Sequence, residues 1–375
     1  MSGAAAFRSA HATGNWSAAA KRCLDQLGGA RENENLGFLY VTDLLAPDIS
    51  SILTFLRETT GIEHWVGTTG IGVYATGAQH FEEPAMAVMT AAFPADSFSI
   101  FSTITADVGA FRRDHEDWLR RAGPGLGVVH GDPRNPRLPV LVEELANASS
   151  AFLVGGVASS RGAFPQIAGD VTQGGLSGVL FAADIPVAVG LTQGCLPAGP
   201  VHTVTEGLGN VVSALDDENV LAVLAEDLGC SGAGDLADQI EAVEAAVPIP
   251  GSDTGDYLVR NLIGIDADRG LLVVGERLNV GDKLMFVRRG HEAAEADLMR
   301  MLAGLKRRLD APPRGGIYVA CVGRGPTIFA DDEGESEIDI IRRELGDFPL
   351  VGFFANGEIS HNRLYGYTGV LALFL

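Results

Sequence analysis

The stretch PLVGFFANGEI, residues 349–359, joins an apolar run to a carboxylate through two glycines. The run contains the step Val351-Gly352, and the same step occurs earlier at Val66-Gly67 and Val154-Gly155. Each time, a strand-like segment and a helix-like segment precede an apolar strand that ends in this step, and small residues lead from it to another strand. The recurrence predicts three related strand–helix–strand units. The alternative is that any α/β protein contains such triplets by chance.

Strand and helix patterns alternate along the chain, which is typical of sheets covered by helices. The fold class that we predict is α+β, with mixed β-sheets flanked by helices. The predicted strands are 37–43, 64–72, 85–93, 125–132, 152–162, 175–181, 316–325, 349–359 and 365–374, and the main predicted helices are 138–148, 217–228, 291–310 and 335–346. If the three units are related, their connecting loops should gather at one edge of the fold, where ligands of α/β sheets often bind.

A segment of different composition separates the second unit from the third. Residues 186–217 are rich in β-branched residues and punctuated by glycine and proline, and a hairpin is predicted around the turn at 266–270. This break predicts two domains, residues 1–225 and residues 226–375.

Composition limits the classes of partner. The chain has 375 residues, 46% of them hydrophobic, and a formal net charge of −21. Such a surface repels nucleic-acid phosphates and anionic lipid heads, so we expect neither as a partner. The sequence has no signal-peptide pattern and no apolar run of about 20 residues, so we expect a soluble, cytoplasmic protein.

Motifs for cofactors and metals are lacking. The four cysteines are far apart and form no CxxC pair, which argues against a structural zinc site or a disulfide framework. The glycine-rich loops lack the GxGxxG and GK[ST] spacings, and neither HE dipeptide has the second histidine of HExxH. We therefore expect no cofactor and no metal.

Seven stretches, in this order, resemble those of FIST-domain proteins: VGTTGIGV (66–73), LVGGVAS (153–159), TQGCLPAGP (192–200), HTVTEGLGNVVSALD (202–216), GDKLMFVRR (281–289), YVACVGRG (318–325) and LVGFFANGEI (350–359). Residues 7–27 also resemble the helix that leads into the family's first module. The resemblance implies an N-terminal and a C-terminal FIST module. It also implies a role in sensory signal transduction, with small molecules such as amino acids as ligands and a signalling protein as a partner.

The strongest candidate site residues follow two strands of the third unit. Arg324, between two glycines, could hold a carboxylate with both arms of its guanidinium. Glu358 and Asn356 could hold an ammonium or hydroxyl group, so the pair Arg324 and Glu358 would fit the two ends of an amino acid. The alternative is a structural salt bridge between them. Cys321 could line the same pocket or be a buried small side chain.

Further candidates lie in the second unit and in the segment after it. Ser159 could reach a ligand or close a turn, and Gln193 and Cys195 could line a pocket. Cys195 could also act as a nucleophile with His202 as its base. Pro197 and Pro200, which lie between Cys195 and His202, favour a rigid turn instead.

The sequence therefore predicts a cytoplasmic small-molecule binding or sensory protein, with an amino acid or small acid as the expected class of ligand. The alternatives are a cysteine-dependent hydrolase and a scaffold for protein interactions. An enzyme would turn over a substrate, whereas a binding protein would only be stabilised by its ligand.

Overall fold

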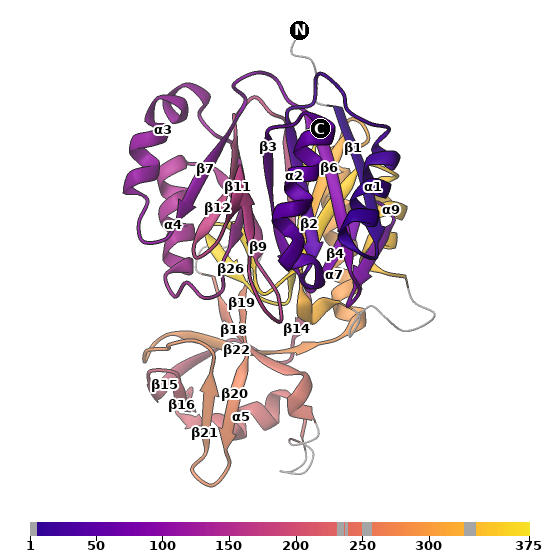
Figure 1. The fold of residues 1–375 in the computed structure, drawn as a ribbon. Coiled ribbons are helices and arrows are strands. Elements are labelled where there is room, and N and C mark those ends of the chain that lie inside the picture. The colour runs from indigo at the N-terminus through magenta and orange to yellow at the C-terminus, as the bar shows by residue number, and fades with distance from the viewer. Residues whose placement is uncertain (1–5, 231–235, 237–238, 250–256, 326–334) are drawn as a thin grey trace. The chain divides into compact units, whose positions relative to one another are not determined.

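The computed structural model describes residues 6–230, 236, 239–249, 257–325 and 335–375 (Figure 1). The chain forms two compact units. The first consists of residues 1–192 together with 297–375, and the second of residues 193–296. The second unit is thus an insertion in the sequence of the first.

The first unit contains three copies of one order of elements: strand, helix, strand, helix, strand, a two-stranded hairpin and a last strand. Repeat A comprises β1 (Ala6–Thr13), α1 (Trp16–Leu27), β2 (Leu36–Thr42), α2 (Ile49–Thr60), β3 (His64–Gly70), β4 (Gly72–Ala75), β5 (Ala78–Phe81) and β6 (Ala85–Ala92). Repeat B comprises β7 (Phe98–Ile104), α3 (Gly109–Ala122), β8 (Leu126–Gly131), α4 (Leu138–Ser149), β9 (Phe152–Val157), β10 (Gln166–Ala168), β11 (Asp170–Thr172) and β12 (Leu176–Phe181). Repeat C comprises β13 (Val187–Gln193), α7 (His291–Lys306), β23 (Gly315–Cys321), α9 (Glu337–Leu345), β24 (Leu350–Ala355), β25 (Glu358–His361), β26 (Arg363–Tyr365) and β27 (Thr368–Phe374), with the second unit inserted between β13 and α7.

Each repeat is the basis of one six-stranded sheet, and each sheet is completed by a hairpin from another repeat. The strand orders are β1-β6-β2-β3-β10-β11, β7-β12-β8-β9-β25-β26 and β13-β27-β23-β24-β4-β5. Hairpin β10–β11 of repeat B therefore joins the sheet of A, β25–β26 of C joins the sheet of B, and β4–β5 of A joins the sheet of C. The three repeats are interlocked in a cycle, and both the predicted repeat and the predicted α+β class are confirmed.

The recurring glycine occupies the same place in all three sheets. The two strands around each helix are parallel, and Gly67, Gly155 and Gly352 lie opposite Leu39, Val129 and Tyr318 in them. A Cβ atom on these glycines would lie 1.8, 1.9 and 1.6 Å from the carbonyl oxygens of those partners. Only glycine permits this approach of the two backbones.

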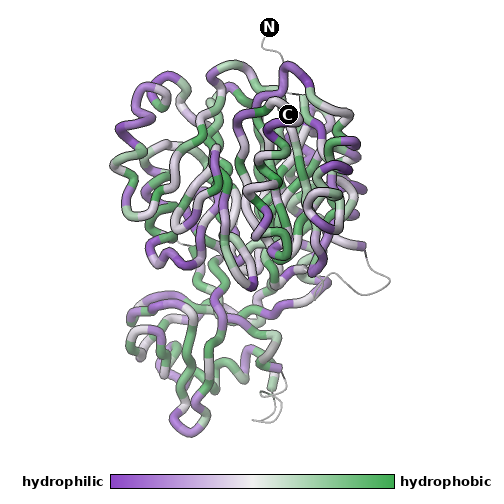
Figure 2. The backbone as a smooth tube through the Cα atoms, in the orientation of Figure 1, coloured by the Kyte–Doolittle hydropathy of each residue, from purple (hydrophilic) through white to green (hydrophobic). Residues whose placement is uncertain are grey.

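One hydrophobic core joins the inner faces of the three sheets. It contains Phe38 and Val66 from the first sheet, Val128 from the second, and Val319 and Phe353 from the third, all at most 1% exposed. Helices α1 and α2 cover the outer face of the first sheet, and α3 and α4 cover that of the second. In Figure 2 the strands of this unit are mostly hydrophobic, whereas the helices carry hydrophilic stretches.

The second unit is built mainly of strands: β14 (Cys195–Pro197), β15 (His202–Leu208), β16 (Val211–Leu215), β17 (Glu218–Asn219), β18 (Val243–Pro248), β19 (Tyr257–Arg260), β20 (Leu262–Asp266), β21 (Leu271–Val274) and β22 (Lys283–Arg289). Helix α5 (Val220–Asp227) is capped by Asn219, whose side chain accepts a hydrogen bond from the N–H of Leu221. The helix packs on this sheet. The predicted hairpin is present as β20 and β21.

Two local expectations were wrong. Residues 7–27 are not one helix, because β1 precedes α1 and pairs with β6 along eight residues. The strands do not end at the Val-Gly steps, because β3 continues to Gly70, β9 to Val157 and β24 to Ala355. The segments 64–72 and 349–359 each cross from one sheet to another after these points. Only Ile71 separates β3 from β4, which is too short for a hairpin turn, so the chain continues into the neighbouring sheet.

Candidate functional site

The connections that follow the three glycine-bearing strands meet at Ser159. Its N–H donates to the carbonyl oxygen of Thr69 in repeat A at 3.3 Å. Its hydroxyl donates to the carbonyl oxygen of Phe354 in repeat C and accepts from the N–H of Ile71 at 2.8 Å. The expected gathering of the loops at one edge is therefore confirmed. Ser159 is 3% exposed, and its hydroxyl serves to join the repeats.

Glu358 lies close to these connections, in the first position of β25. It is fully buried, and its Oε2 accepts hydrogen bonds from the hydroxyl of Thr368 at 2.7 Å and from the N–H of the same residue at 3.2 Å. Its Oε1 has no hydrogen-bond partner within the described residues. Burial raises the pKa of Glu358 to about 8, against the lowering effect of Thr368 and of the nearby charge of Arg324. The carboxyl group is therefore mostly protonated at pH 7.

Arg324 is held by a carboxylate that the sequence did not indicate. Its guanidinium donates to Oε1 of Glu337 through Nε at 3.0 Å and through a terminal nitrogen at 2.7 Å. Tyr318 and Tyr74 donate their hydroxyls to Glu337 at 2.9 and 3.0 Å. Burial alone would lower the pKa of Arg324, but the charge of Glu337 outweighs it, so the arginine remains charged.

Cys321 belongs to the same cluster, and its environment disfavours the thiolate. Burial, followed by the nearby charge of Glu358, raises the pKa of this thiol to about 12. Because the thiolate is the reactive form, this position is unsuited to a nucleophile. The structure thus brings Arg324, Glu358 and Cys321 near one another, and their part in ligand binding stays a prediction.

The first testable consequence concerns this thiol. At pH 8 a thiol of pKa about 12 is ionised about a thousandfold less than an ordinary cysteine. We expect iodoacetamide to modify Cys321 at least a hundredfold more slowly than free cysteine, as followed by mass spectrometry of the native protein. Modification at the rate of free cysteine would contradict the described environment.

The other predicted site residues are placed elsewhere. Asn356 is exposed in the turn between β24 and β25, where its N–H donates to the carbonyl oxygen of Val157. Gln193 and Cys195 belong to the second unit, where the amide of Gln193 donates to the carbonyl oxygen of Tyr257 and the hydroxyl of Tyr257 donates to that of Cys195. Their part in ligand binding stays a prediction.

His202 is unsuited to serve Cys195 as a base. Its Nδ1 lies 2.8 Å from Oδ2 of Asp216, and its Nε2 lies 3.0 Å from Oδ2 of Asp227. Although partial burial lowers the pKa of His202, the two carboxylates outweigh it and raise the pKa overall. Both ring nitrogens are thus engaged by acids, and none remains to take a proton from the thiol.

A second buried polar group lies in the core and was missed by the sequence reasoning. Nε2 of His130 lies 3.1 Å from the hydroxyl of Tyr40, and burial lowers the pKa of His130 to about 3. Three buried atoms here have no hydrogen-bond partner in the part of the chain that the structure describes: Nδ1 of His130, Oε1 of Gln166 and Oγ of Ser177. The pairing of neighbouring strands places Ser177, His130 and Glu358 in one row across the second sheet. Gly156 lies between His130 and Glu358 in this row.

Comparison with known proteins gives the family of the chain. Residues 35–218 match the FIST N domain, and residues 221–361 match the FIST C domain. The chain belongs to the FIST family. FIST domains are associated with sensory signal transduction.

Relatives of this FIST protein occur in mycobacteria. An uncharacterized protein of Mycobacterium tuberculosis (strain ATCC 25618 / H37Rv) is 32% identical over 334 residues, which cover 83% of each chain. An uncharacterized protein of Mycobacterium bovis (strain ATCC BAA-935 / AF2122/97) is 27% identical over 378 residues, which cover 95% of this chain and 94% of the relative.

The two FIST matches meet near residue 220, inside the second compact unit. A boundary between family modules is therefore not a boundary between compact units here. The division between residues 225 and 226 stays a prediction. Within the described ranges of this FIST protein, none of the helices is long and apolar enough to cross a membrane.

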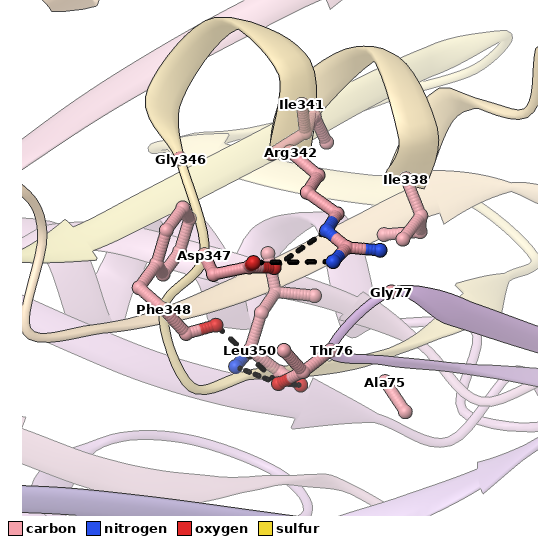
Figure 3. A pocket seen from close by; sticks show the side chains of 10 residues that line it. All are labelled: Ala75, Thr76, Gly77, Ile338, Ile341, Arg342, Gly346, Asp347, Phe348 and Leu350. Carbon is pink, nitrogen blue, oxygen red and sulfur yellow. Dashed lines mark hydrogen bonds and ion pairs between the residues drawn. The ribbon is translucent and has the colours of Figure 1, made fainter.

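Three surface hollows lined by described residues of the FIST protein include none of the buried residues Arg324, Glu337 and Glu358. The pocket in Figure 3 is bordered by α9 and by Thr76, whose hydroxyl accepts from the N–H of Leu350 at 2.9 Å. Its free volume is ≈ 10 Å³, about the space of one water molecule. Larger hollows of ≈ 480 and ≈ 520 Å³ lie beside Trp118 and beside Arg31. Among the described residues that line them, no buried side-chain polar atom lacks a partner.

Proposed function

We propose that this FIST protein is a cytoplasmic sensory protein for a small ligand, and that the ligand places a hydrogen-bond donor, such as the ammonium group of an amino acid, against Glu358. The observation that carries the proposal is the fully buried Oε1 of Glu358, which lacks a partner among the described residues. Because Oε2 already accepts two hydrogen bonds, Oε1 carries the proton of Glu358 at pH 7. A cationic ligand that displaces this proton would pair with the carboxylate and recover the free-energy cost of the unpaired buried group.

The role of Arg324 in this proposal differs from the one that we first expected. Glu337 already pairs with the guanidinium at 2.7 Å, so a ligand carboxylate would have to compete with a buried ion pair. We therefore assign the cationic or donor end of the ligand to Glu358. Arg324 supplies a positive charge that limits the rise in the pKa of that carboxyl group.

The raised pKa makes the stability of the unliganded protein depend on pH. The carboxyl group of Glu358 stays protonated to about pH 8 in the folded protein, whereas its ordinary pKa is 4.5. The folded state binds the extra proton, so this group lowers the free energy of unfolding as pH rises from about 4.5 to about 8. Above pH 8 the full cost is roughly 4 to 5 kcal/mol.

Glu358→Gln removes this cost. We expect the variant to gain stability relative to the parent protein between pH 5 and pH 9, as measured by urea unfolding at both values. The neutral amide keeps the shape of the protonated carboxyl group, so the fold should be retained. If the variant and the parent protein differed in free energy of unfolding by the same amount at pH 5 and at pH 9, Glu358 would not titrate as described.

The proposed function is tested by a thermal-shift screen of amino acids, simple amines and small carboxylic acids. A ligand that binds only the folded state raises the melting temperature by mass action and is recovered unchanged. We expect amines and amino acids to stabilise the protein, and Glu358→Gln to abolish the shift. The matched control is Glu344→Gln, which removes a partly exposed carboxylate on α9 and should leave the shift intact. Stabilisation by carboxylic acids alone would contradict the assignment to Glu358.

A further inference from the structure

An edge strand of the second unit carries two exposed isoleucines. Strand β20 pairs only with β21 among the described strands, and a bulge leaves Ile263 without a partner there. Ile263 is 62% exposed and Ile265 is 37% exposed. Natural sheets protect such an edge with charged residues or proline, because its free N–H and C=O groups can pair with another chain. Residues 262–265 contain neither, so this edge is open to a further strand.

An apolar row leads across the sheet to the same strand. The pairing of neighbouring strands places Leu208, Val211, Val273 and Gly264 in one row across β15, β16, β21 and β20. Leu208 is 85% exposed, and both valines are half-buried. A Cβ atom on Gly264 would meet no atom within 4 Å, so another backbone can approach the end of the row closely. We call Leu208, Val211, Val273 and residues 262–266 the β20 surface.

The apolar area of the β20 surface fits a protein interface. A leucine or isoleucine side chain loses roughly 100 Å² of apolar surface on full burial, so the exposed fractions above amount to on the order of 300 Å². Exposed apolar patches of a few hundred Å² mark interaction sites on soluble proteins. A standard interface buries about 800 Å² on each partner, of which slightly more than half is apolar. The β20 surface therefore supplies most of the apolar part that such an interface needs.

We propose that the β20 surface joins two copies of this chain, through antiparallel pairing of β20 with β20 of the second copy around a twofold axis at Gly264. This register places Ile263 of each copy opposite Ile265 of the other. It also places Arg260 of each copy opposite Asp268, which is exposed in the turn after β20. Apolar side chains thus meet apolar ones and opposite charges meet each other, twice each, as a twofold interface requires.

The charges near β20 favour this partner and this orientation. The net charge of −21 makes two copies repel each other over most of their surface. Near the β20 surface basic groups offset the acidic ones, since Arg269 lies in the turn after β20 and Arg277 approaches Gly209, the residue after Leu208. Parallel pairing in register would instead place each Asp268 beside its own counterpart, which is unfavourable.

The first experiment is sedimentation velocity of the full chain over a hundredfold range of concentration. We expect a dimer that dissociates on dilution. Ile263→Asp should weaken association at least a hundredfold, because two carboxylates would enter the apolar contact, and Leu208→Asp should weaken it at least tenfold. The matched control is Val140→Asp, which alters a 46% exposed valine on α4 and should leave the dimer unchanged.

Thermal melting of the variants checks that each is folded, which we expect because the replaced side chains are exposed. A parent protein that stays monomeric over the whole range would overturn the proposal. So would a dimer that Ile263→Asp leaves as stable as Val140→Asp does.

A cross-link tests the position of the twofold axis. A cysteine at Gly264 would lie opposite its own counterpart, so a short bis-maleimide should join two copies of Gly264→Cys far more efficiently than two copies of the parent protein. Gly162→Cys is the control, because its site in the first unit also has open space around it. Equal cross-linking of Gly264→Cys and Gly162→Cys would contradict pairing through β20.

Discussion

Gly352→Ala is expected to lower the free energy of unfolding by about 3 to 5 kcal/mol, because the new methyl group has no place between two paired backbones. Its Cβ would lie 1.6 Å from the carbonyl oxygen of Tyr318. That oxygen belongs to a parallel strand in the middle of the third sheet, and moving it would disturb the pairing along β23 and β24. Urea unfolding gives the change directly.

A control separates this effect from an ordinary loss of glycine. Gly162 has open space around it and needs no unusual backbone angle, so Gly162→Ala should change stability by less than about 0.5 kcal/mol. Since Gly67 and Gly155 occupy the equivalent places, alanine at either should be as harmful as at Gly352. A mild effect at any of the three would argue against the shared local structure.

Arg324→Ala is expected to cost about 3 to 5 kcal/mol, because it leaves a buried carboxylate without its partner. Glu337 is 1% exposed and would keep only the two tyrosine hydroxyls. The measurement is urea unfolding at pH 7. Removal of both partners, in Arg324→Met with Glu337→Gln, should cost less than Arg324→Ala because no uncompensated charge remains.

The matched control for the ion pair is at the surface. Arg342 pairs with Asp347, and both side chains are more than half exposed. Arg342→Ala should cost less than about 1 kcal/mol. If both arginine variants had the same small effect, the Arg324–Glu337 pair would not be buried in solution as the structure describes.

The repeat could be predicted from the sequence, but its interlocking could not. The Val-Gly steps indicate three related units because each glycine meets the same steric demand, a carbonyl oxygen within 2 Å of where a Cβ would lie. The interlocking depends on which sheet each hairpin joins after the glycine-bearing strand of its own repeat. The sequence of β25 is compatible with pairing to β24 or to β9, and only the packing of three sheets around one core selects β9.

The neighbouring positions of Arg324 and Glu358 could be predicted from the sequence, but the buried polar residues around them could not. Arg324 and Glu358 were expected to be neighbours because they follow adjacent strands, and the structure places them in one cluster. The sequence did not indicate Glu337 as the partner of Arg324, because a glutamate in the first turn of an acidic helix usually faces solvent. His130 was missed because a single histidine in a strand carries no spacing that would distinguish a buried polar core from a surface position.

The central claim is that a cationic group of the ligand pairs with Glu358 and displaces the proton that its carboxyl group holds at pH 7, and proton release on binding tests this most directly. Calorimetry of the first ligand found by the screen, in two buffers of different ionisation enthalpy at pH 7, gives the number of protons exchanged. For a cationic ligand we predict the release of about one proton per ligand, since the pKa of about 8 must fall on pairing, and none in Glu358→Gln. Equal proton exchange in the parent protein and the variant would contradict the account.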